Sequence, residues 1–367
     1  MSYHRALRNL RRRVRNRGSK RARGGIRETA GKKHQLLVDI FNEYKAGEEP
    51  PGLTEHTPVH VGLYVAEITA IEPKENTFTI EGYLDLKWQD ERLTQMGLMN
   101  GHPTHFMEQA AERVVGHIWW PDLIFSNGVG RKIIENQDLI VHPDGTVEYK
   151  QKFEQKLEAH FDLKRFPFDK QRLEIEIESF SWPSTLVKIL KWDSWSGFST
   201  KYEIPAWQTE DMRITVEDVQ EEREHERFSL FKATINVERR YQYCLWKIML
   251  PLIVIVAISW CVFWVNLENI GNRMEILLAV LLTWVAYQFI FSQDLPKLGY
   301  LTYLDYLFLL SFFFIASVFL QAVIVSVLLI RGGQSRIRAE RINNHCKWAY
   351  PTAYGLVMIC FNVFYLA

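Results

Sequence analysis

The sequence predicts a β-sandwich domain of immunoglobulin-like topology, followed by a bundle of four membrane-spanning helices. Up to about residue 240, short segments of alternating apolar and polar residues are separated by turns, which is typical of antiparallel sandwiches. After residue 244, four segments contain no Asp, Glu, Lys or Arg, and they are 20, 18, 25 and 20 residues long. About 20 apolar residues cross a hydrocarbon core. The four segments are 248–267, 276–293, 306–330 and 348–367.

The first 33 residues differ from the rest of the chain in charge. Residues 1–33 contain thirteen Lys or Arg and the single acid Glu28, whereas the whole chain has a net charge of only +1. We expect a basic, disordered arm, because such charge blocks repel themselves. Binding of nucleic acid or anionic lipid by this arm is the weaker alternative. All four cysteines lie at or after Cys244, so the preceding region is expected to fold without a disulfide.

The predicted sandwich domain covers residues 34–240. In the segment 77–88, alternate residues are apolar, which indicates a strand with one buried face. Segments 212–219 and 228–237 predict a closing hairpin. We also expect a short helix within 34–46 and another helical stretch within 95–116.

The predicted membrane domain covers residues 241–367, with helices at about 246–267, 273–294, 303–330 and 347–366. The connecting loop 331–346 is rich in Arg, and the positive-inside tendency therefore makes it cytoplasmic. With four spans, the sandwich domain and the C-terminus then lie outside, in the periplasm of a protein of the inner membrane. This orientation requires export, yet the apolar run Leu36 to Phe41 is too short for a signal-peptide core.

The segment 273–294 is unusual because its apolar stretch is interrupted by one carboxylate. Side chains at steps of four, three, four and three residues lie on one stripe of a helix. That stripe consists of one acid, two small residues and two large apolar ones: Glu275, Ala279, Leu282, Ala286 and Phe289. An ionisable residue within a membrane span indicates a functional site, so we predict water along this stripe. In the alternative, Glu275 reaches the interface and pairs with Arg273.

Several motifs in the same order resemble the pentameric ligand-gated ion channels, the Cys-loop receptor superfamily, and in particular their prokaryotic branch. Each motif is weak by itself, but together they cover the chain from about residue 58 to its end. They are WQDERL at Trp88–Leu93, WWPD at Trp119–Asp122, FPFDKQ at Phe166–Gln171, Arg239 twelve residues before Pro251, and LPK at Leu295–Lys297.

One departure from the family pattern lies at the FPFD loop. Eukaryotic members bracket this loop with two cysteines, and the corresponding positions here are Ala159 and Leu173. The resemblance therefore implies a loop without its disulfide, as in bacterial members. We expect packing of Phe166 and Phe168 to replace the covalent link.

The resemblance implies that 273–294 lines a pore in a homopentamer, and it selects the same stripe as the periodicity. Five copies of Glu275 would form a ring of carboxylates at the cytoplasmic end, which favours monovalent cations over anions. Rings of Leu282 and Phe289 would close the pore by dewetting.

The resemblance also implies a small-molecule agonist, an amine or an aromatic compound, bound between adjacent subunits in a box of aromatic side chains. By register, Phe125 or Ser126, Phe180 and Phe228 would form one side, and Tyr83 the other. Tyr83 lies on the polar face of its strand, which favours a binding role. For the three phenylalanines a role in the core remains open.

Coupling between the domains is expected where they meet. By resemblance, Asp169 pairs with Arg239, close to the turn Glu72–Asn76 and the loop Leu295–Thr302. The expected coupling residues are Glu72, Glu75, Phe166, Pro167, Phe168, Asp169, Arg239, Pro296 and Lys297. An ion pair remade between two states is a switching element, and a purely structural link is the alternative.

Other classes of function fit the sequence less well. There is no HExxH, GxSxG or Walker motif and no Cys/His cluster at metal spacing, so we predict no enzyme, no cofactor and no metal. The spans show no inverted repeat of the kind found in transporters. We therefore predict a ligand-gated, cation-selective channel in contact with membrane lipid. The alternatives are a proton-gated channel and a membrane-anchored binding module without conduction.

Overall fold

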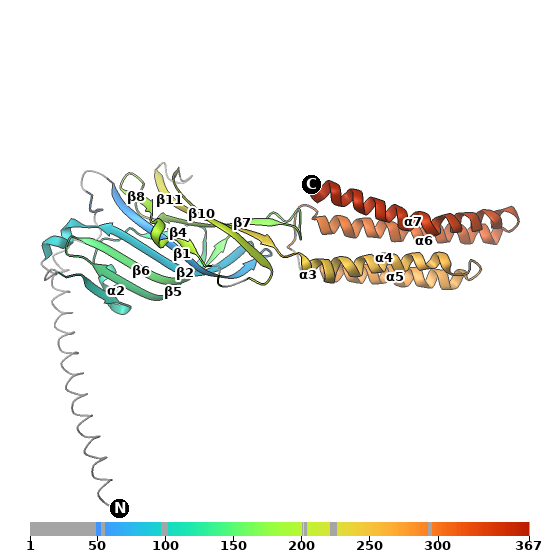
Figure 1. The fold of residues 1–367 in the computed structure, drawn as a ribbon, viewed down its shortest axis with the longest axis horizontal. Coiled ribbons are helices and arrows are strands. Elements are labelled where there is room, and N and C mark those ends of the chain that lie inside the picture. The colour runs from blue at the N-terminus through green and yellow to red at the C-terminus, as the bar shows by residue number, and fades with distance from the viewer. Residues whose placement is uncertain are drawn as a thin grey trace, which may run out of the picture.

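A computed structural model describes residues 49–52, 56–96, 102–199, 201, 204–220, 226–292 and 296–366. The predicted basic arm 1–33 and the helix expected within 34–46 lie outside the described residues. Figure 1 shows a β-rich domain at one end of an elongated molecule and long helices at the other, with the C-terminus back at the junction of the two.

The larger sheet of the β domain has seven strands. Their order is β3-β5-β6-β2-β1-β8, and β9 also pairs with β1. β8 and β9 run parallel to β1, whereas the other pairs are antiparallel. The strands are β1 (Thr57–Glu72), β2 (Thr77–Gln89), β3 (Thr104–Met107), β5 (Gly128–Val141), β6 (Thr146–Glu158), β8 (Val187–Lys191) and β9 (Gly197–Phe198).

The smaller sheet has four strands in the order β10-β11-β7-β4. They are β4 (Leu123–Phe125), β7 (Lys170–Ser179), β10 (Trp207–Gln220) and β11 (Arg227–Arg239). The predicted hairpin is confirmed, since β10 and β11 pair along their length. Three short helices complete the domain: η1 (Glu91–Met96), α2 (Gln109–Val115), which is the helix expected within 95–116, and η2 (Asp193–Trp195).

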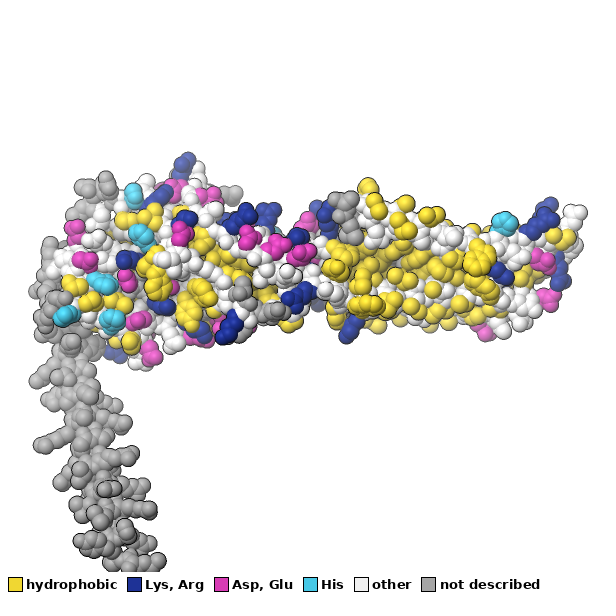
Figure 2. All heavy atoms as spheres, in the orientation of Figure 1, with side chains coloured by type: hydrophobic (Ala, Val, Ile, Leu, Met, Phe, Trp, Pro, Cys, Tyr) yellow, Lys and Arg dark blue, Asp and Glu magenta, His cyan; other side chains and the backbone are white. Residues whose placement is uncertain are grey.

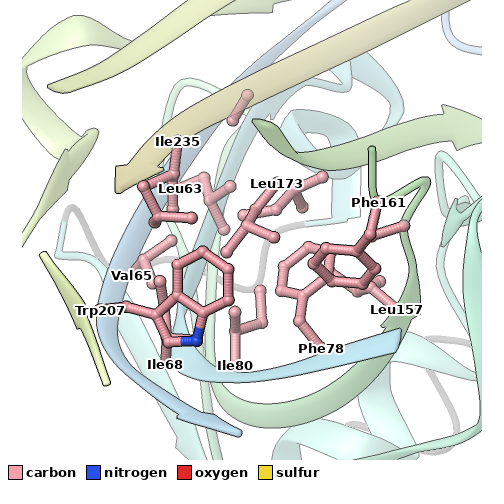
Figure 3. Close-up of a cluster of buried hydrophobic side chains, with 14 of the residues drawn as sticks. Leu63, Val65, Ile68, Phe78, Ile80, Leu157, Phe161, Leu173, Trp207 and Ile235 are labelled. Atoms are coloured by element: carbon pink, nitrogen blue, oxygen red, sulfur yellow. The ribbon is translucent and has the colours of Figure 1, made fainter. Parts of the chain in front are cut away.

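The core of the sandwich lies between the two sheets. Figure 3 shows Leu63 and Phe78 of the larger sheet facing Leu173 and Ile235 of the smaller one. Each fully buried Leu, Ile or Phe side chain contributes about 1.5–3 kcal/mol. The alternation predicted for β2 is confirmed on its apolar face, but on its polar face Asp85 is only 6 % exposed.

Helical segments follow the sandwich and form an apolar block (Figure 2). The first span is continuous from Gln242 to Trp264 through α3 (Gln242–Cys244), a π-helical turn η3 (Leu245–Met249), α4 (Leu250–Trp260) and η4 (Cys261–Trp264). The other helices are α5 (Ile270–Phe291), α6 (Tyr303–Arg331) and α7 (Gln334–Leu366). Among the described residues, three helical segments are long and apolar enough to cross a membrane: the first span, α5 and α6.

The last helix differs from the prediction at its start. α7 begins at Gln334, so most of the expected loop 331–346 is helical and only Gly332 and Gly333, both with positive φ, separate α6 from α7. The span was predicted from a segment without charged residues. Such a segment indicates where a helix becomes apolar, but the helix itself can begin earlier, in a charged stretch. From Trp348 onward α7 has no charged residue, and it returns along α6 to the junction, where the Tyr303 hydroxyl donates to Asn362 Oδ1 at 2.8 Å.

Candidate functional site

The predicted stripe of α5 is exposed on the single protomer. The opposite side of the helix packs inward through Arg273, Leu277, Val280, Trp284 and Phe291. Glu275, Ala279, Leu282, Ala286 and Phe289 are all exposed. Leu282 and Phe289, 70 % and 68 % exposed, are among the least covered apolar residues of the helix. The described residues of the protomer leave this face exposed, so it can face a water-filled space.

Arg273 lies on the inward side of α5 and is 1 % exposed. Its Nη2 donates to Asn343 Oδ1 of α7 at 2.7 Å, and Asn343 Nδ2 donates to the carbonyl of Phe263 at 3.0 Å. In the described part of the chain, Arg273 therefore forms no ion pair with Glu275. The pairing considered as an alternative for Glu275 is wrong, because the two side chains point to opposite sides of the helix.

At the junction of the domains, the expected pair of Asp169 and Arg239 is present. Arg239 Nε lies 2.7 Å from Asp169 Oδ1 and Nη2 lies 3.2 Å from Oδ2, a two-pronged geometry. Gln171 Nε2 donates to the same carboxylate at 2.7 Å. The Arg239 guanidinium also lies 4.0 Å from the ring centre of Trp207 and 4.8 Å from that of Phe166. A charge swap would place a carboxylate against two ring faces, so exchange of the residues is not a neutral test of this pair.

The segment 162–168, which contains the FPF motif, contacts the helices directly. The N–H of Leu163 donates to the Tyr300 hydroxyl at 3.0 Å, and the N–H of Tyr303 donates to the carbonyl of Lys164 at 2.8 Å. Phe168 packs edge-on against Tyr303, with ring centres 5.4 Å apart. The segment thus reaches the first turn of α6.

Phe166, Pro167, Pro296 and Lys297 are further expected coupling residues. Phe166, next to the buried cis Pro167, faces Phe291 at the end of α5, with ring centres 6.5 Å apart. Pro296 is half-buried and Lys297 is exposed just before α6.

Glu72 and Glu75 form part of the β1–β2 turn, where both pair with Lys156 of β6, at 3.0 and 2.6 Å. The hydrogen bond from Lys156 lowers the pKa of Glu75 below its ordinary value. The described contacts of these two acids are therefore within the β domain.

On the smaller sheet, the predicted agonist residues lie in different environments. Phe125 packs on the core residue Phe153, with ring centres 5.0 Å apart, and Phe228 is only 4 % exposed. Ser126 is exposed, and the Phe180 ring is 69 % exposed immediately after β7. Phe180 therefore offers the freest aromatic face of the set.

Lys132 is a cation that the sequence reasoning missed on this side of the molecule. Its Nζ lies 5.7 Å from the Phe125 ring centre. Burial lowers the pKa of Lys132 to about 8.

Tyr83 lies on the outer face of the larger sheet, and it is not alone there. Its ring centre is 6.4 Å from that of Tyr64, and the Lys150 ammonium lies 5.1 Å from it. Lys150 also lies 5.1 Å from the ring of Trp195 and 3.9 Å from Asp85. The sequence reasoning missed Asp85 and Lys150, although a carboxylate between Leu84 and Leu86 was a detectable signal.

The predicted agonist residues thus form two half-sites within one protomer. Tyr83 belongs to the larger sheet, whereas Phe125, Phe180 and Phe228 belong to or follow strands of the smaller one. In the described structure no contact joins Tyr83 to the other three. Such a separation suits a site completed by a neighbouring subunit.

Comparison with known proteins gives matches to both domains. The family model for the neurotransmitter-gated ion-channel ligand binding domain matches residues 33–241, and that for the neurotransmitter-gated ion-channel transmembrane region matches residues 248–364. The chain is similar to a proton-gated ion channel of Gloeobacter violaceus, 24 % identical over 320 residues that cover 87 % of this chain and 86 % of the relative.

Two animal proteins are also similar to the chain. A glutamate-gated chloride channel subunit beta of Haemonchus contortus is 23 % identical over 301 residues, covering 78 % of this chain and 67 % of the relative. A gamma-aminobutyric acid receptor subunit beta-4 of Gallus gallus is 26 % identical over 298 residues, covering 78 % of this chain and 59 % of the relative.

Proposed function

Because the chain belongs to the family of neurotransmitter-gated ion channels, we propose that it forms a cation-selective channel opened by a small molecule. Family membership makes it a multi-pass membrane protein and a ligand-gated ion channel, and it implies assembly as a pentamer. In our proposal the assembly is a homopentamer.

The unpartnered stripe of α5 is the observation that supports the ion pathway. Five copies of α5 around an axis could turn one exposed stripe of each copy toward that axis. The stripe, exposed in the described part of the protomer, is Glu275, Ala279, Leu282, Ala286 and Phe289. A ring of five carboxylates attracts cations and repels anions. Leu282 and Phe289 would form two apolar constrictions above it, which close to ions when they lose water.

The position of the membrane is supported by side chains at the ends of the helices. Trp264 and Trp348 meet at one end of the bundle, with ring centres 6.5 Å apart, and Trp246 is exposed near the other. Tryptophans favour the interface between hydrocarbon and water. The basic residues at the start of α7 favour a cytoplasmic location for that end. In our proposal the membrane is the inner membrane, and the β domain and the C-terminus lie in the periplasm.

The two half-sites support a ligand bound between subunits. Phe180 presents a free ring on the smaller sheet and Tyr83 lies on the larger one, so adjacent copies of the chain would bring them together. Aromatic faces favour an amine or an aromatic compound. Phe125, Ser126 and Phe228 would support the same side as Phe180.

Coupling between ligand and pore is proposed to run through the junction. The pair of Asp169 and Arg239, together with the segment 162–168, connects β7 and β11 to the start of α6. Movement of the β domain would therefore be transmitted to the helices through these contacts. Glu72, Glu75, Pro296 and Lys297 are proposed to support this region.

Protons are a second candidate signal, favoured by Asp85. Burial raises the pKa of this carboxyl to about 6, despite the nearby Lys150. A drop in pH from 7 to 5 would then neutralise a charge in the proposed ligand-binding face.

Recording from the purified protein in planar bilayers tests the proposal. We expect currents evoked by a member of a panel of small amines and aromatic compounds, or by a drop in pH, and saturating with its concentration. A protein that is folded and pentameric but passes no current under any of these conditions would contradict channel function and favour a membrane-anchored binding module.

A further inference from the structure

The segment 192–198 runs along β1 at the edge of the larger sheet, where the N–H of Trp192 donates to the carbonyl of Val61 and Gly197–Phe198 pair with β1, and Trp195 lies over Gly62. A Cβ atom at Gly62 would lie 2.7 Å from Trp195 Cβ, and one at Gly197 would lie 3.2 Å from the Tyr64 ring. The N–H of Leu63 donates to Ser196 Oγ at 3.2 Å. The position of Trp195 is therefore fixed by glycine at the contact and by a hydrogen bond to β1.

A buried acid lies beside this segment. Gly62 on β1 and Lys150 on β6 are the cross-strand neighbours of Asp85 on β2. Asp85 is 6 % exposed, and Lys150, at 3.9 Å, is its ion-pair partner within the described chain. A carboxylate in such a place is costly unless a cation compensates it.

The Lys150 ammonium lies close to two aromatic rings. Its Nζ is 5.1 Å from the ring centre of Tyr83 and equally 5.1 Å from that of Trp195. Distances within about 6 Å are those of cation–π attraction. Two aromatic faces and one carboxylate are the groups that recognise an organic ammonium ion, and here a side chain of the protein supplies that ion.

The surrounding charges have other partners. Glu148 pairs with Lys87 at 2.9 Å and lies 3.7 Å from His142, and Lys152 pairs with Glu81 at 3.5 Å and with Glu135. The second nearby cation, Lys87, lies over the ring of Trp192 at 5.4 Å. Lys150 is thus the cation that these contacts assign to Asp85.

We propose that Lys150 is an intramolecular occupant of a cation site formed by Tyr83, Trp195 and Asp85, and that an external organic ammonium ion enters this site only when Lys150 leaves it. Lys150 is then a specificity-determining residue, because a cationic ligand has to compete with it. The inference rests on the proposed function in treating the Tyr83 face as part of the ligand site.

The effective concentration of the tethered Lys150 ammonium determines how strongly it competes with an external cation. A group on a short tether acts at an effective concentration on the order of mM. A weakly binding amine at lower concentration is therefore excluded while Lys150 is present. The raised pKa of Asp85 agrees with this arrangement, because burial outweighs the attraction of Lys150 and leaves an acid that a better-placed cation would stabilise.

Removal of the Lys150 charge provides the test. In Lys150→Gln, Asp85 is buried without its partner, so we expect the detergent-solubilised pentamer to melt at a lower temperature at pH 8. Ethylammonium chloride should restore the melting temperature with saturation, because a ligand that binds the folded state stabilises it. The apparent dissociation constant for ethylammonium should be about tenfold or more lower than in the wild type.

A matched control is available on the same strand. Lys152→Gln removes a neighbouring ammonium that also contacts two acids, and ethylammonium should leave its melting temperature unchanged beyond the effect of equal NaCl. Adding Asp85→Asn or Trp195→Leu to Lys150→Gln should abolish the rescue. If Lys150→Gln does not yield a folded pentamer, Lys150→Met, which keeps the side-chain stem over the rings, is measured in its place.

Two results would overturn the proposal: rescue of Lys150→Gln no greater than that of Lys152→Gln, or rescue that persists without Trp195. Because melting measures binding and not conduction, these outcomes are independent of the channel assignment. Absence of current with every ligand would contradict the proposed function and leave this binding result intact.

Discussion

Four charged side chains in the described chain are less than 9 % exposed, and they differ in how they are stabilised. Asp90 receives a two-pronged bond from Arg92, at 2.8 and 2.9 Å. Asp169 receives a two-pronged bond from Arg239 and a third bond from Gln171. Arg273 has the neutral amide of Asn343 as its partner. Asp85 has only an ammonium at 3.9 Å, beyond hydrogen-bond distance. Asp85 is therefore the least compensated of the four.

Replacement of Asp85 by Asn should make the protein more stable at high pH. The folded-state pKa of about 6 lies above the ordinary value of 3.8, so the folded state binds the proton more tightly than the unfolded chain. Ionisation of Asp85 then destabilises the fold above pH 6, by at most about 3 kcal/mol. This penalty disappears as the pH falls from 6 towards 4. The melting temperature of Asp85→Asn should be higher than that of the wild type at pH 8 and equal to it near pH 4.

Asp144 provides a control of opposite sign. Its carboxylate accepts the N–H of Thr146 at 2.9 Å in an exposed turn, and this bond lowers its pKa. The ionised Asp144 stabilises the fold fully at pH values above its pKa in the unfolded chain. This stabilisation is lost as the pH falls through its lower pKa in the folded state. Asp144→Asn should therefore melt below the wild type at pH 8. An Asp85→Asn variant that also melts below the wild type at pH 8 would contradict a destabilising Asp85.

At the scale of elements, the start of α6 is one place where the β domain contacts the helices directly. Thr302 and Asp305 form a capping box, in which each side chain bonds the other's backbone N–H. The same turn supplies the N–H that reaches Lys164 and follows the Tyr300 hydroxyl that accepts from Leu163. In the proposed coupling, a shift of the segment 162–168 would move the first turn of α6.

Tyr300→Phe should weaken this connection more than Tyr365→Phe. Loss of the Tyr300 hydroxyl leaves the buried N–H of Leu163 without its acceptor, which costs about 1–3 kcal/mol. The Tyr365 hydroxyl, at 3.3 Å, donates to the Lys164 carbonyl, which already accepts from Tyr303. We expect Tyr300→Phe to shift the concentration for half-maximal current, with ligand binding unchanged. An equal shift of the half-maximal concentration in both variants would contradict a role in coupling for the hydrogen bond between Leu163 and Tyr300.

In α5, Leu282→Ser should increase current in the absence of ligand, because a polar ring stays hydrated where an apolar one dewets. Leu281 is the matched control, because this leucine immediately precedes Leu282 but is half-buried against the protomer's own core. Liposome flux assays without ligand compare the two serine variants. Leak through Leu281→Ser as large as that through Leu282→Ser would contradict Leu282 as the constriction.

The elements that sequence reasoning predicted are those determined by local pattern. The β10–β11 hairpin and the exposed stripe of α5 follow from the spacing of apolar residues along one segment. The early start of α7 was missed because its first turns are polar. Trp195 over Gly62 was missed for another reason, since this contact joins segments more than 130 residues apart and depends on the absence of a Cβ. The position of Lys150 near the Trp195 ring depends on the same contact and was missed for the same reason.

For the whole molecule, a mostly apolar block of helices follows, along the long axis, a β domain whose surface mixes charged and apolar side chains (Figure 2). The stripe of α5 and the two half-sites are unfinished in one protomer, and pentameric assembly offers a partner for each. In our proposal one rotation axis serves both, because five copies would place Glu275 around a pore and would bring Tyr83 toward the Phe180 of a neighbour. Opening of such a pore would then be a property of the assembly and not of the single chain.

The most direct test of this account is the reversal potential in a tenfold KCl gradient across a planar bilayer. Wild-type channels should reverse near the potassium equilibrium potential, about 59 mV from zero. Glu275→Gln, which removes the ring of carboxylates without changing its size, should move the reversal potential toward zero. An identical reversal potential in both proteins, or a wild type that reverses near the chloride equilibrium potential, would contradict a pore lined by Glu275.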